Sequence, residues 1–289
     1  MERVRCITED NINLIGFLYD CNSDNKCWNL IFPGVDGNII TNEFIDEIGR
    51  LLSKNKYKFL CCHHRGSFQI YSSNPIDPNI RGKTIGSVFE KFDDCFYDID
   101  AWLKYSIENG ANKINIMAHS HGCNKLIYYL SHNSVYDKYI NKIILLSPLD
   151  LRTRMNNRKE LNELYKKASL AKEKNDQDSF ICCGFFYKNW SSFYDMMENK
   201  NIDNFPMMSI NNNNFDMFNE IKKDKYIIYG EDEIKYITNL KYKKQFLDKN
   251  LKEIKIISSA SHIYQGKEKV IAEYILDIIR RKEWVVCII

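Results

Sequence analysis

Short apolar runs alternate with segments of helical spacing along most of this chain, and this alternation restricts its fold more than any other feature. Six runs read as buried strands, at residues 28–32, 57–62, 113–117, 139–146, 226–229 and 254–257. Helical spacing separates or follows them at residues 44–52, 89–107, 123–130 and 270–279. Because crossovers between parallel strands are right-handed, this alternation predicts an α/β fold, a mostly parallel central sheet with helices on both faces. We expect residues 1–289 to form one domain.

Two local motifs refine this pattern near the N-terminal half. Residues 4–6 and 13–18 read as a hairpin, which would add antiparallel strands at one edge of the sheet. Ser87 and Glu90 have the spacing of a capping box, and an apolar stripe begins at Phe89. A helix is therefore expected to begin just after Ser87.

Residues 151–225 interrupt the alternation, because they contain no convincing strand. An insertion of this length in a compact domain is usually a lid or binding element, so a mainly helical lid is expected. Its aromatic side chains either line a pocket for an apolar acyl or aryl group or pack the lid: Phe185, Phe186, Tyr187, Trp190, Phe193 and Tyr194. Its first basic residues either form a solvated face or meet an anionic substrate: Arg152, Arg154, Arg158 and Lys159.

Composition narrows the classes of function. A net charge of +3, without an arginine-rich helix or zinc-finger spacing, argues against nucleic acid as a partner. No apolar run approaches the roughly 18 residues of a membrane span, and the segment MERVRCITED lacks the apolar part of a signal peptide. The ten cysteines show no CxxC spacing. We therefore expect a cytoplasmic protein with reduced thiols and without a metal site.

The segment Ala118-His119-Ser120-His121-Gly122 joins a predicted strand to a predicted helix. A nucleophile elbow needs small residues two positions before and two after the nucleophile, and Ala118 and Gly122 meet this need. Ser120 is therefore the candidate nucleophile. We interpret His119 as a packing residue and the His121 side chain as part of the pocket lining.

Candidates for the base and the acid follow later strands, because ligands of a parallel sheet bind beyond the carboxyl ends of its strands. Of six histidines, only His262 lies beyond residue 132, and it follows the last predicted strand. His262 is therefore the candidate base. The acid that orients it is expected to be Asp232, with Glu233 as the close alternative and Asp150 as the third candidate.

Two backbone N–H groups are needed to stabilise the oxyanion of a tetrahedral intermediate. One is expected from His121, the residue after the nucleophile. The other is expected from the loop at residues 33–37, where Val35 is the preferred donor and Gly34 gives the backbone close access.

The chain order of these groups is nucleophile, acid and histidine, with the oxyanion loop upstream, as in the α/β-hydrolase superfamily. The resemblance to this superfamily extends over nearly the whole chain. Within it, FEKFDDCFYDIDAWLKYSIENGANKINIMAHSHGCNKLIYYL and SSASHIYQGKEKVIAEYI resemble a group of cytosolic bacterial serine hydrolases related to the fungal fusarinine (siderophore) esterases. The chain departs from that pattern at Ala118, at Pro33 and at the acid, where the usual Gly-x-x-Asp is compressed or ends in Glu233.

The resemblance implies a serine hydrolase that cleaves an acyl ester or thioester through an acyl-enzyme, with no metal or organic cofactor. Thioesterase, peptidase or acyltransferase activity in a biosynthetic pathway would use the same triad and stays an alternative. A non-catalytic binding protein on this fold is disfavoured, because Ser120, His262 and an acid are all present. The expected partner is a small-molecule acyl substrate, free or bound to a carrier or to CoA.

Overall fold

An eight-stranded sheet forms the centre of the molecule in a computed structural model, which describes residues 1–21, 23–73, 82–237 and 239–281. Its strand order is β1-β2-β4-β3-β7-β8-β11-β12. The strands are β1 (Glu2–Ile7), β2 (Asn13–Tyr19), β3 (Cys27–Phe32), β4 (Lys58–Cys62), β7 (Lys113–His119), β8 (Ile140–Leu146), β11 (Asp224–Gly230) and β12 (Leu251–Ile257). All pairs from β4 to β12 in this order are parallel, whereas β1 and β2 form the antiparallel hairpin predicted at one edge.

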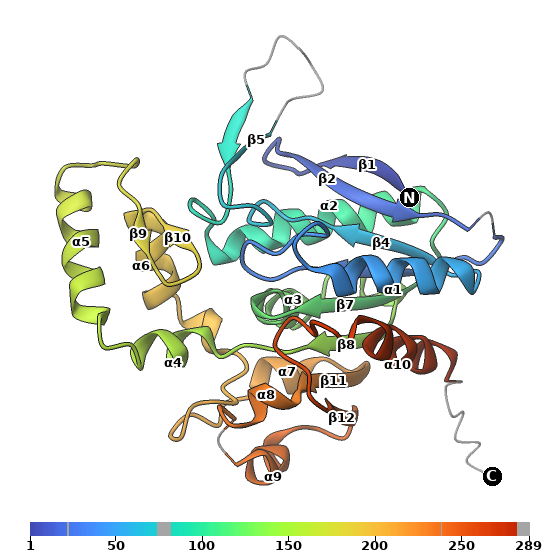
Figure 1. Ribbon diagram of the computed structural model, residues 1–289. Coiled ribbons are helices and arrows are strands. Elements are labelled where there is room, and N and C mark those ends of the chain that lie inside the picture. The colour runs from blue at the N-terminus through green and yellow to red at the C-terminus, as the bar shows by residue number, and fades with distance from the viewer. Residues whose placement is uncertain (22, 74–81, 238, 282–289) are drawn as a thin grey trace.

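Helices cover both faces of this sheet, which confirms the predicted α/β architecture (Figure 1). On one face, α1 (Glu43–Lys54) and α10 (Glu268–Arg280) pack against each other and share one apolar core with the sheet. On the other face, α2 (Cys95–Glu108) and α3 (His121–Leu130) bury a second core. Strands β7 and β8 lie between these cores, and their side chains are almost all buried, as is typical of the central strands of a parallel sheet.

The helix predicted to begin just after Ser87 begins later, so the capping-box interpretation is wrong. A 3₁₀ turn spans Phe92–Asp94, and α2 starts only at Cys95. The Glu90 carboxylate does not cap a helix, because it is buried in an ion pair with Lys125. The Glu90 carboxylate therefore pairs with the Lys125 ammonium and not with a backbone N–H at a helix start.

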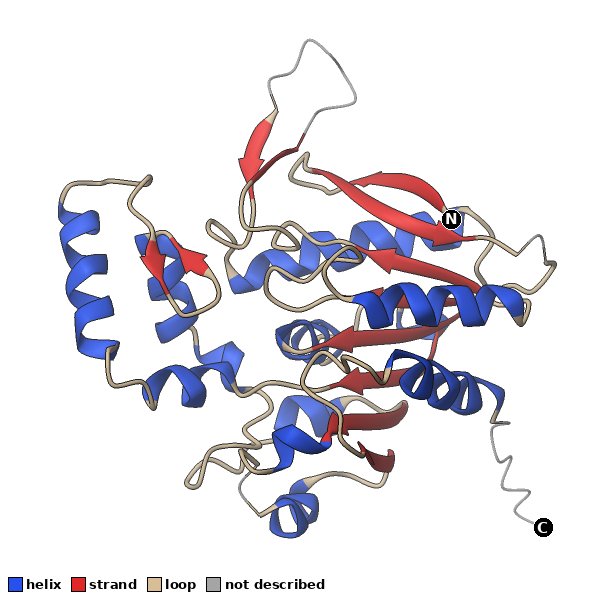
Figure 2. Cartoon of the chain, viewed as in Figure 1, coloured by secondary structure: helices blue, strands red, loops and turns tan. Residues whose placement is uncertain are grey.

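The inserted segment, residues 151–223, runs from the start of α4 to the residue before β11. It contains α4 (Leu151–Asn156), α5 (Leu161–Glu173), α6 (Trp190–Glu198) and α7 (Asp216–Glu220), together with a hairpin of β9 (Ile181–Cys182) and β10 (Tyr187–Lys188). Figure 2 shows its mainly helical character, as predicted, although the short hairpin was not expected. In Figure 1, the arrowheads of β7 and β8 point toward this segment.

Much of the inserted segment has an apolar core of its own. Phe186 and Phe193 are fully buried within it, and Val35 from the β3–α1 loop packs against it. The inserted segment therefore contacts the loop in which an oxyanion donor was predicted.

Shorter elements complete the chain. A two-stranded sheet pairs β5 (Tyr71–Ser73) with β6 (Lys83–Ile85), and two short helices, α8 (Glu231–Ile234) and α9 (Leu240–Lys243), follow β11. Further 3₁₀ turns span Asp137–Tyr139, Lys200–Asp203 and Lys244–Phe246. Within the described ranges, no helix has the length and apolar character that crossing a bilayer requires.

Candidate active site

Ser120 occupies a strained turn between the end of β7 and the start of α3. Its φ of 55° and ψ of −129° belong to a region that residues with a side chain rarely adopt. The backbones around it pass so closely that a Cβ on Gly122 would lie 2.4 Å from the carbonyl oxygen of Pro33. This is the geometry of a nucleophile elbow, which presents the serine hydroxyl at the top of the sheet.

The short helix α8 after β11 and the loop after β12 bring a carboxylate and a histidine next to this hydroxyl. His262 Nε2 lies 2.9 Å from Ser120 Oγ, and His262 Nδ1 lies 2.6 Å from Glu233 Oε1. Residues that are 142 and 29 positions apart in the chain thus form one continuous hydrogen-bonded line. A histidine held this way by a carboxylate keeps the tautomer that can accept a proton from the serine.

The Glu233 carboxylate is fixed by further donors. Its Oε2 accepts a hydrogen bond from the Gly230 backbone N–H at 2.9 Å and another from the Ser147 hydroxyl. Ser147 in turn lies 2.8 Å from the Tyr264 hydroxyl. Burial opposes the charge, but the hydrogen bonds from His262, Ser147 and Gly230 outweigh it and lower the pKa of Glu233.

The preference for Asp232 as the residue that contacts His262 is contradicted by this geometry. Asp232 is exposed, and its backbone N–H donates to the carbonyl oxygen of Ala260. Glu233 is the third residue of α8, and its side chain folds back to the Gly230 N–H at the helix start, which turns it toward His262. Neighbouring helical residues point in different directions, so only one of the two can face the histidine.

Asp150, the third candidate acid, has a structural role in this arrangement. Its carboxylate caps α4 by accepting a hydrogen bond from the Thr153 N–H at 3.1 Å. It also accepts from the backbone N–H groups of Met208 and Ser209. Both carboxylate oxygens are therefore occupied away from His262.

The two histidines that flank Ser120 do not contact its hydroxyl. His119 donates a hydrogen bond from Nε2 to the His262 carbonyl oxygen at 2.8 Å and packs on Phe44, which agrees with its interpretation as a packing residue. Burial, with a smaller effect from His262, lowers the pKa of His119 to about 3, so its ring is neutral at physiological pH. The His121 ring is also buried and packs on Phe92.

Both backbone donors predicted for the oxyanion hole are free of protein acceptors in the described part of the chain. Neither the Val35 N–H nor the His121 N–H donates a hydrogen bond to another residue there. Gly34 lies directly against Ser120, because a Cβ at this position would come within 2.7 Å of Ser120 Cβ. The β3–α1 loop and the start of α3 thus meet beside the serine, as the sequence predicts.

A pocket of about 340 Å³ adjoins His262 and Glu233. Most of its other lining residues are apolar or aromatic: Pro148, Leu149, Met207, Met208, Tyr229, Tyr236 and Ile237. The remaining lining residues are polar or charged: Arg154, Asn157, Asp232 and Lys235. None of the six aromatic residues predicted to shape a pocket is among those that line it in the described structure. Phe186 and Phe193 instead fill the core of the inserted segment.

Of the four basic residues near the start of the inserted segment, Arg154 is the one that lines this pocket. Arg152 forms an ion pair with Asp203 at 2.8 Å, and Arg158 donates to the Cys183 carbonyl oxygen at 2.9 Å. These two side chains therefore hold the inserted segment together.

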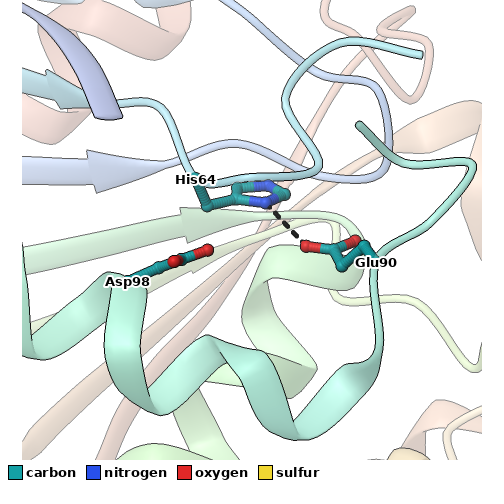
Figure 3. A group of neighbouring side chains, drawn as sticks. All are labelled: His64, Glu90 and Asp98. Atoms are coloured by element: carbon teal, nitrogen blue, oxygen red, sulfur yellow. Dashed lines mark hydrogen bonds and ion pairs between the residues drawn. The ribbon is translucent and has the colours of Figure 1, made fainter. Parts of the chain in front are cut away.

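A second group of ionisable side chains is buried behind the β3–α1 loop. His64, Glu90 and Asp98 offer ligand atoms that lie within 4.8 Å of one another, and Figure 3 shows the contact between His64 and Glu90. However, Glu90 forms an ion pair with Lys125, and Asp98 forms one with Arg65 at 2.9 Å. Because these two cations already neutralise the carboxylates, we assign no metal to this group.

Sequence reasoning assigned no role to His64. The one available signal was its position, because it lies just beyond the carboxyl end of β4, next to the strand that leads to the oxyanion loop. Its partners Glu90 and Lys125 lie 26 and 61 positions away in the chain and carry no such signal.

The family described as "Protein of unknown function (DUF1749)" matches residues 3–279. No curated protein sequence matches the chain. Among solved structures, Est1E from Butyrivibrio proteoclasticus is 14% identical with a TM-score of 0.58, over 97% of this chain and 100% of that protein. The Pyrococcus furiosus esterase Pf2001 is 17% identical with a TM-score of 0.55, over 97% and 90% of the two chains.

The α/β hydrolase GrgF from Penicillium sp. sh18 is 14% identical to this chain, with a TM-score of 0.64 over 97% of this chain and 98% of that one. At such identities the likeness concerns the fold. It confirms the α/β-hydrolase fold that the sequence predicts.

Proposed function

This chain belongs to the DUF1749 family, and we propose that it is a serine hydrolase that cleaves a carboxylic ester. The observation that carries the proposal is the hydrogen-bonded line from Ser120 through His262 to Glu233, with distances of 2.9 and 2.6 Å. An ordinary serine between a strand and a helix needs neither a strained φ nor a histidine held by a carboxylate.

In the proposed mechanism, Ser120 Oγ attacks the carbonyl carbon of the ester while His262 Nε2 takes its proton. Glu233 stays ionised, holds the imidazole tautomer and stabilises the imidazolium that forms. The oxyanion accepts hydrogen bonds from the backbone N–H groups of His121 and Val35. His262 then protonates the leaving alcohol, and an acyl group remains on Ser120.

Water completes the reaction by the same steps. His262 removes a proton from a water molecule, which attacks the acyl carbon and forms a second tetrahedral intermediate. Collapse of this intermediate releases the carboxylic acid and returns the proton to Ser120. Each proton and each bond is accounted for by these side chains and water.

An ester is favoured over other acyl substrates by the solved structures of similar fold, since Pf2001 is an esterase. The pocket beside His262 supports an acyl or alcohol group of moderate size with an apolar surface, because Leu149, Met207 and Ile237 line it. Arg154 and Lys235 line the same pocket, and their positive charges would favour a substrate that carries a negative charge.

Hydrolysis of p-nitrophenyl acetate and p-nitrophenyl butyrate tests the proposal. Wild type should show ester hydrolysis, with an acyl adduct on Ser120 detectable by mass spectrometry when hydrolysis is stopped early. The Ser120→Ala variant should lose about 10⁴-fold or more in kcat. Equal rates for the two proteins would contradict the proposal.

The same assay with acyl-CoA thioesters and aminoacyl amides separates the alternatives that use the same triad. An esterase should give the highest kcat/KM with the esters. A higher kcat/KM with acyl-CoA or with the amide would identify a thioesterase or a peptidase instead.

A further inference from the structure

The buried group formed by His64, Glu90 and Lys125 touches the loop that carries the proposed oxyanion donor Val35. We propose that His64, held in place by Glu90 and Lys125, is a positioning residue that fixes the Gly34–Val35 peptide beside Ser120. This inference rests on the proposed function and adds a residue that the triad does not include. His64 contacts neither the nucleophile nor the base, so its effect would pass through the backbone of the β3–α1 loop.

His64 holds the loop through two carbonyl oxygens. Its Nε2 lies 3.1 Å from the oxygen of Pro33 and 3.2 Å from the oxygen of Gly34. Carbonyl oxygens only accept hydrogen bonds, so Nε2 carries the proton and donates to both. The imidazole is 3% exposed, so bulk water does not compete for these contacts.

The contact to Gly34 bears directly on the oxyanion hole. The carbonyl of Gly34 and the N–H of Val35 belong to one planar trans peptide, in which the two groups point in opposite directions. A donor that holds the Gly34 oxygen therefore aims the Val35 N–H away from His64. Because the Gly34 backbone lies against Ser120, this direction is fixed next to the nucleophile. The hydrogen bond to the carbonyl also polarises the peptide and strengthens its N–H as a donor.

The other side of the His64 ring contacts two charged side chains and accepts a hydrogen bond from the Gly66 backbone N–H, which lies 3.1 Å from Nδ1. Its Nδ1 lies 2.9 Å from Glu90 Oε1 and 3.3 Å from Lys125 Nζ, and Lys125 also forms an ion pair with Glu90. Burial opposes the charge of Glu90, but Lys125 and His64 outweigh it and hold the pKa of its carboxyl well below the usual range. The fit is tight, since a Cβ on Gly66 would come within 2.3 Å of Glu90 Oε2.

Glu90 also joins the two elements that supply the oxyanion donors. Lys125 lies on α3, the helix that starts at His121, and His64 holds the loop that contains Val35. The Glu90 carboxylate, which contacts both Lys125 and His64, thus connects the helix that supplies the His121 N–H to the loop that supplies the Val35 N–H. The backbone carbonyl of Glu90 accepts a hydrogen bond from the Ser192 hydroxyl, which ties Glu90 to the inserted segment as well.

Two substitutions of His64 distinguish the effect of losing its Nε2–H donor from the effect of losing the imidazole ring. Gln places an amide nitrogen near the position of Nε2 and keeps a donor for the Gly34 oxygen, whereas the shorter Asn does not reach it. The neighbouring His63 supplies a matched control, because it is also buried and contacts the same β3–α1 loop, but at the Ile39 N–H rather than at the Gly34–Val35 peptide. The variants are therefore His64→Asn, His64→Gln and His63→Asn.

Each variant is titrated with a fluorophosphonate to count active serines, so that rates refer to folded enzyme. Per active serine, His64→Asn should lower kcat/KM for p-nitrophenyl butyrate by about 10- to 100-fold, mainly through kcat. The Ki of a trifluoromethyl ketone, which forms a tetrahedral adduct with an oxyanion, should rise by a similar factor. His64→Gln should restore most of both values, and His63→Asn should leave them unchanged.

Three outcomes would overturn the inference. Values of kcat/KM and Ki per active serine that stay within about twofold in His64→Asn would leave His64 with a structural role only. The same would follow if kcat fell without a rise in Ki, or if His64→Gln and His64→Asn lost activity equally. Absence of fluorophosphonate labelling in wild type would overturn the proposed function itself, which separates the two failures.

If His64→Asn yields no titratable enzyme, the double variant Glu90→Gln/Lys125→Met is measured in the same way. It removes both charged neighbours of His64 Nδ1 and leaves the hydrogen bond that Nδ1 accepts from the Gly66 N–H. The inference predicts a smaller parallel change in kcat/KM and Ki, about three- to tenfold. Unchanged values would contradict it.

Discussion

Two carboxylate–histidine pairs flank the candidate nucleophile, and they differ in what the far side of each imidazole meets. In the first, Glu233 holds His262, whose Nε2 faces the Ser120 hydroxyl. In the second, Glu90 holds His64, whose Nε2 faces two backbone carbonyl oxygens. The first pair is partly open, since the Glu233 side chain is 13% exposed and that of His262 is 30% exposed. The second pair is buried, with 4% of the Glu90 side chain and 3% of the His64 side chain exposed.

The same two residue types are thus suited to different roles, according to the groups that surround them. A hydroxyl can give up its proton to an imidazole, so the His262 pair is suited to proton transfer. A carbonyl oxygen can only accept a hydrogen bond, so the His64 pair is suited to holding the backbone. Lys125 completes the distinction, because it forms an ion pair with Glu90, whereas Glu233 pairs with no lysine or arginine in the described part of the chain.

The largest expected effect comes from breaking the first pair. Glu233→Gln should lower kcat by about 10³- to 10⁴-fold, because the imidazole loses the acceptor that sets its tautomer. Asp232→Asn, at the neighbouring exposed position, should change kcat by less than about threefold, since Glu233 rather than Asp232 holds His262. Steady-state hydrolysis of p-nitrophenyl butyrate measures both. A greater loss in Asp232→Asn would restore the acid that the sequence favoured.

Breaking the second pair should act on stability first. Glu90→Gln leaves the ammonium of Lys125 buried without a counter-charge, which should lower the free energy of unfolding by about 3–5 kcal/mol. Replacing both charges, in Glu90→Gln/Lys125→Met, should recover a large part of this loss. Urea denaturation measures the free energies. A double variant as unstable as the single one would argue that the ion pair is not the source of the effect.

The stability of the second pair should depend on pH. Because the pKa of Glu90 is lowered on folding, its contribution to stability is complete above the ordinary value of 4.5 and is lost as pH falls toward the folded-state pKa. The difference in free energy of unfolding between wild type and Glu90→Gln/Lys125→Met should therefore be constant above pH 5 or so and shift against wild type below about 4.5. Urea denaturation at stepped pH values follows this difference. A shift in the opposite direction would contradict the assignment.

The smallest effect is expected at Asp150, which belongs to neither pair. Asp150→Ala removes the cap of α4 and should lower the free energy of unfolding by about 0.5–2 kcal/mol. Its kcat should stay within about twofold of wild type, because the carboxylate does not face His262. Thermal unfolding and the ester assay measure the two quantities. A large loss of kcat with unchanged stability would mean that Asp150 takes part in the reaction.

Most of the fold could be predicted because its signals are local. The alternation of apolar runs and helical spacing sets the parallel sheet, and the small residues around Ser120 mark the elbow. The position of His262 after the last strand was enough to predict that it lies near Ser120. These inferences depend on strand order, which follows from a few general rules.

The remainder depends on contacts between distant residues. The choice between Asp232 and Glu233 depends on how the first turn of α8 faces His262, which residue order does not reveal. The sequence suggested that Glu90 caps a helix, because its actual partner, Lys125, lies 35 positions further along the chain and gives no local signal. His64 finds its carbonyl partners 30 and 31 positions upstream.

The proposed function requires Ser120 to be a nucleophile activated by His262. Labelling with a fluorophosphonate, followed by peptide mapping by mass spectrometry, tests this requirement. We expect a single adduct on Ser120 in wild type, no adduct in Ser120→Ala, and greatly slowed labelling in His262→Ala. An adduct on another serine, or none in wild type, would contradict it.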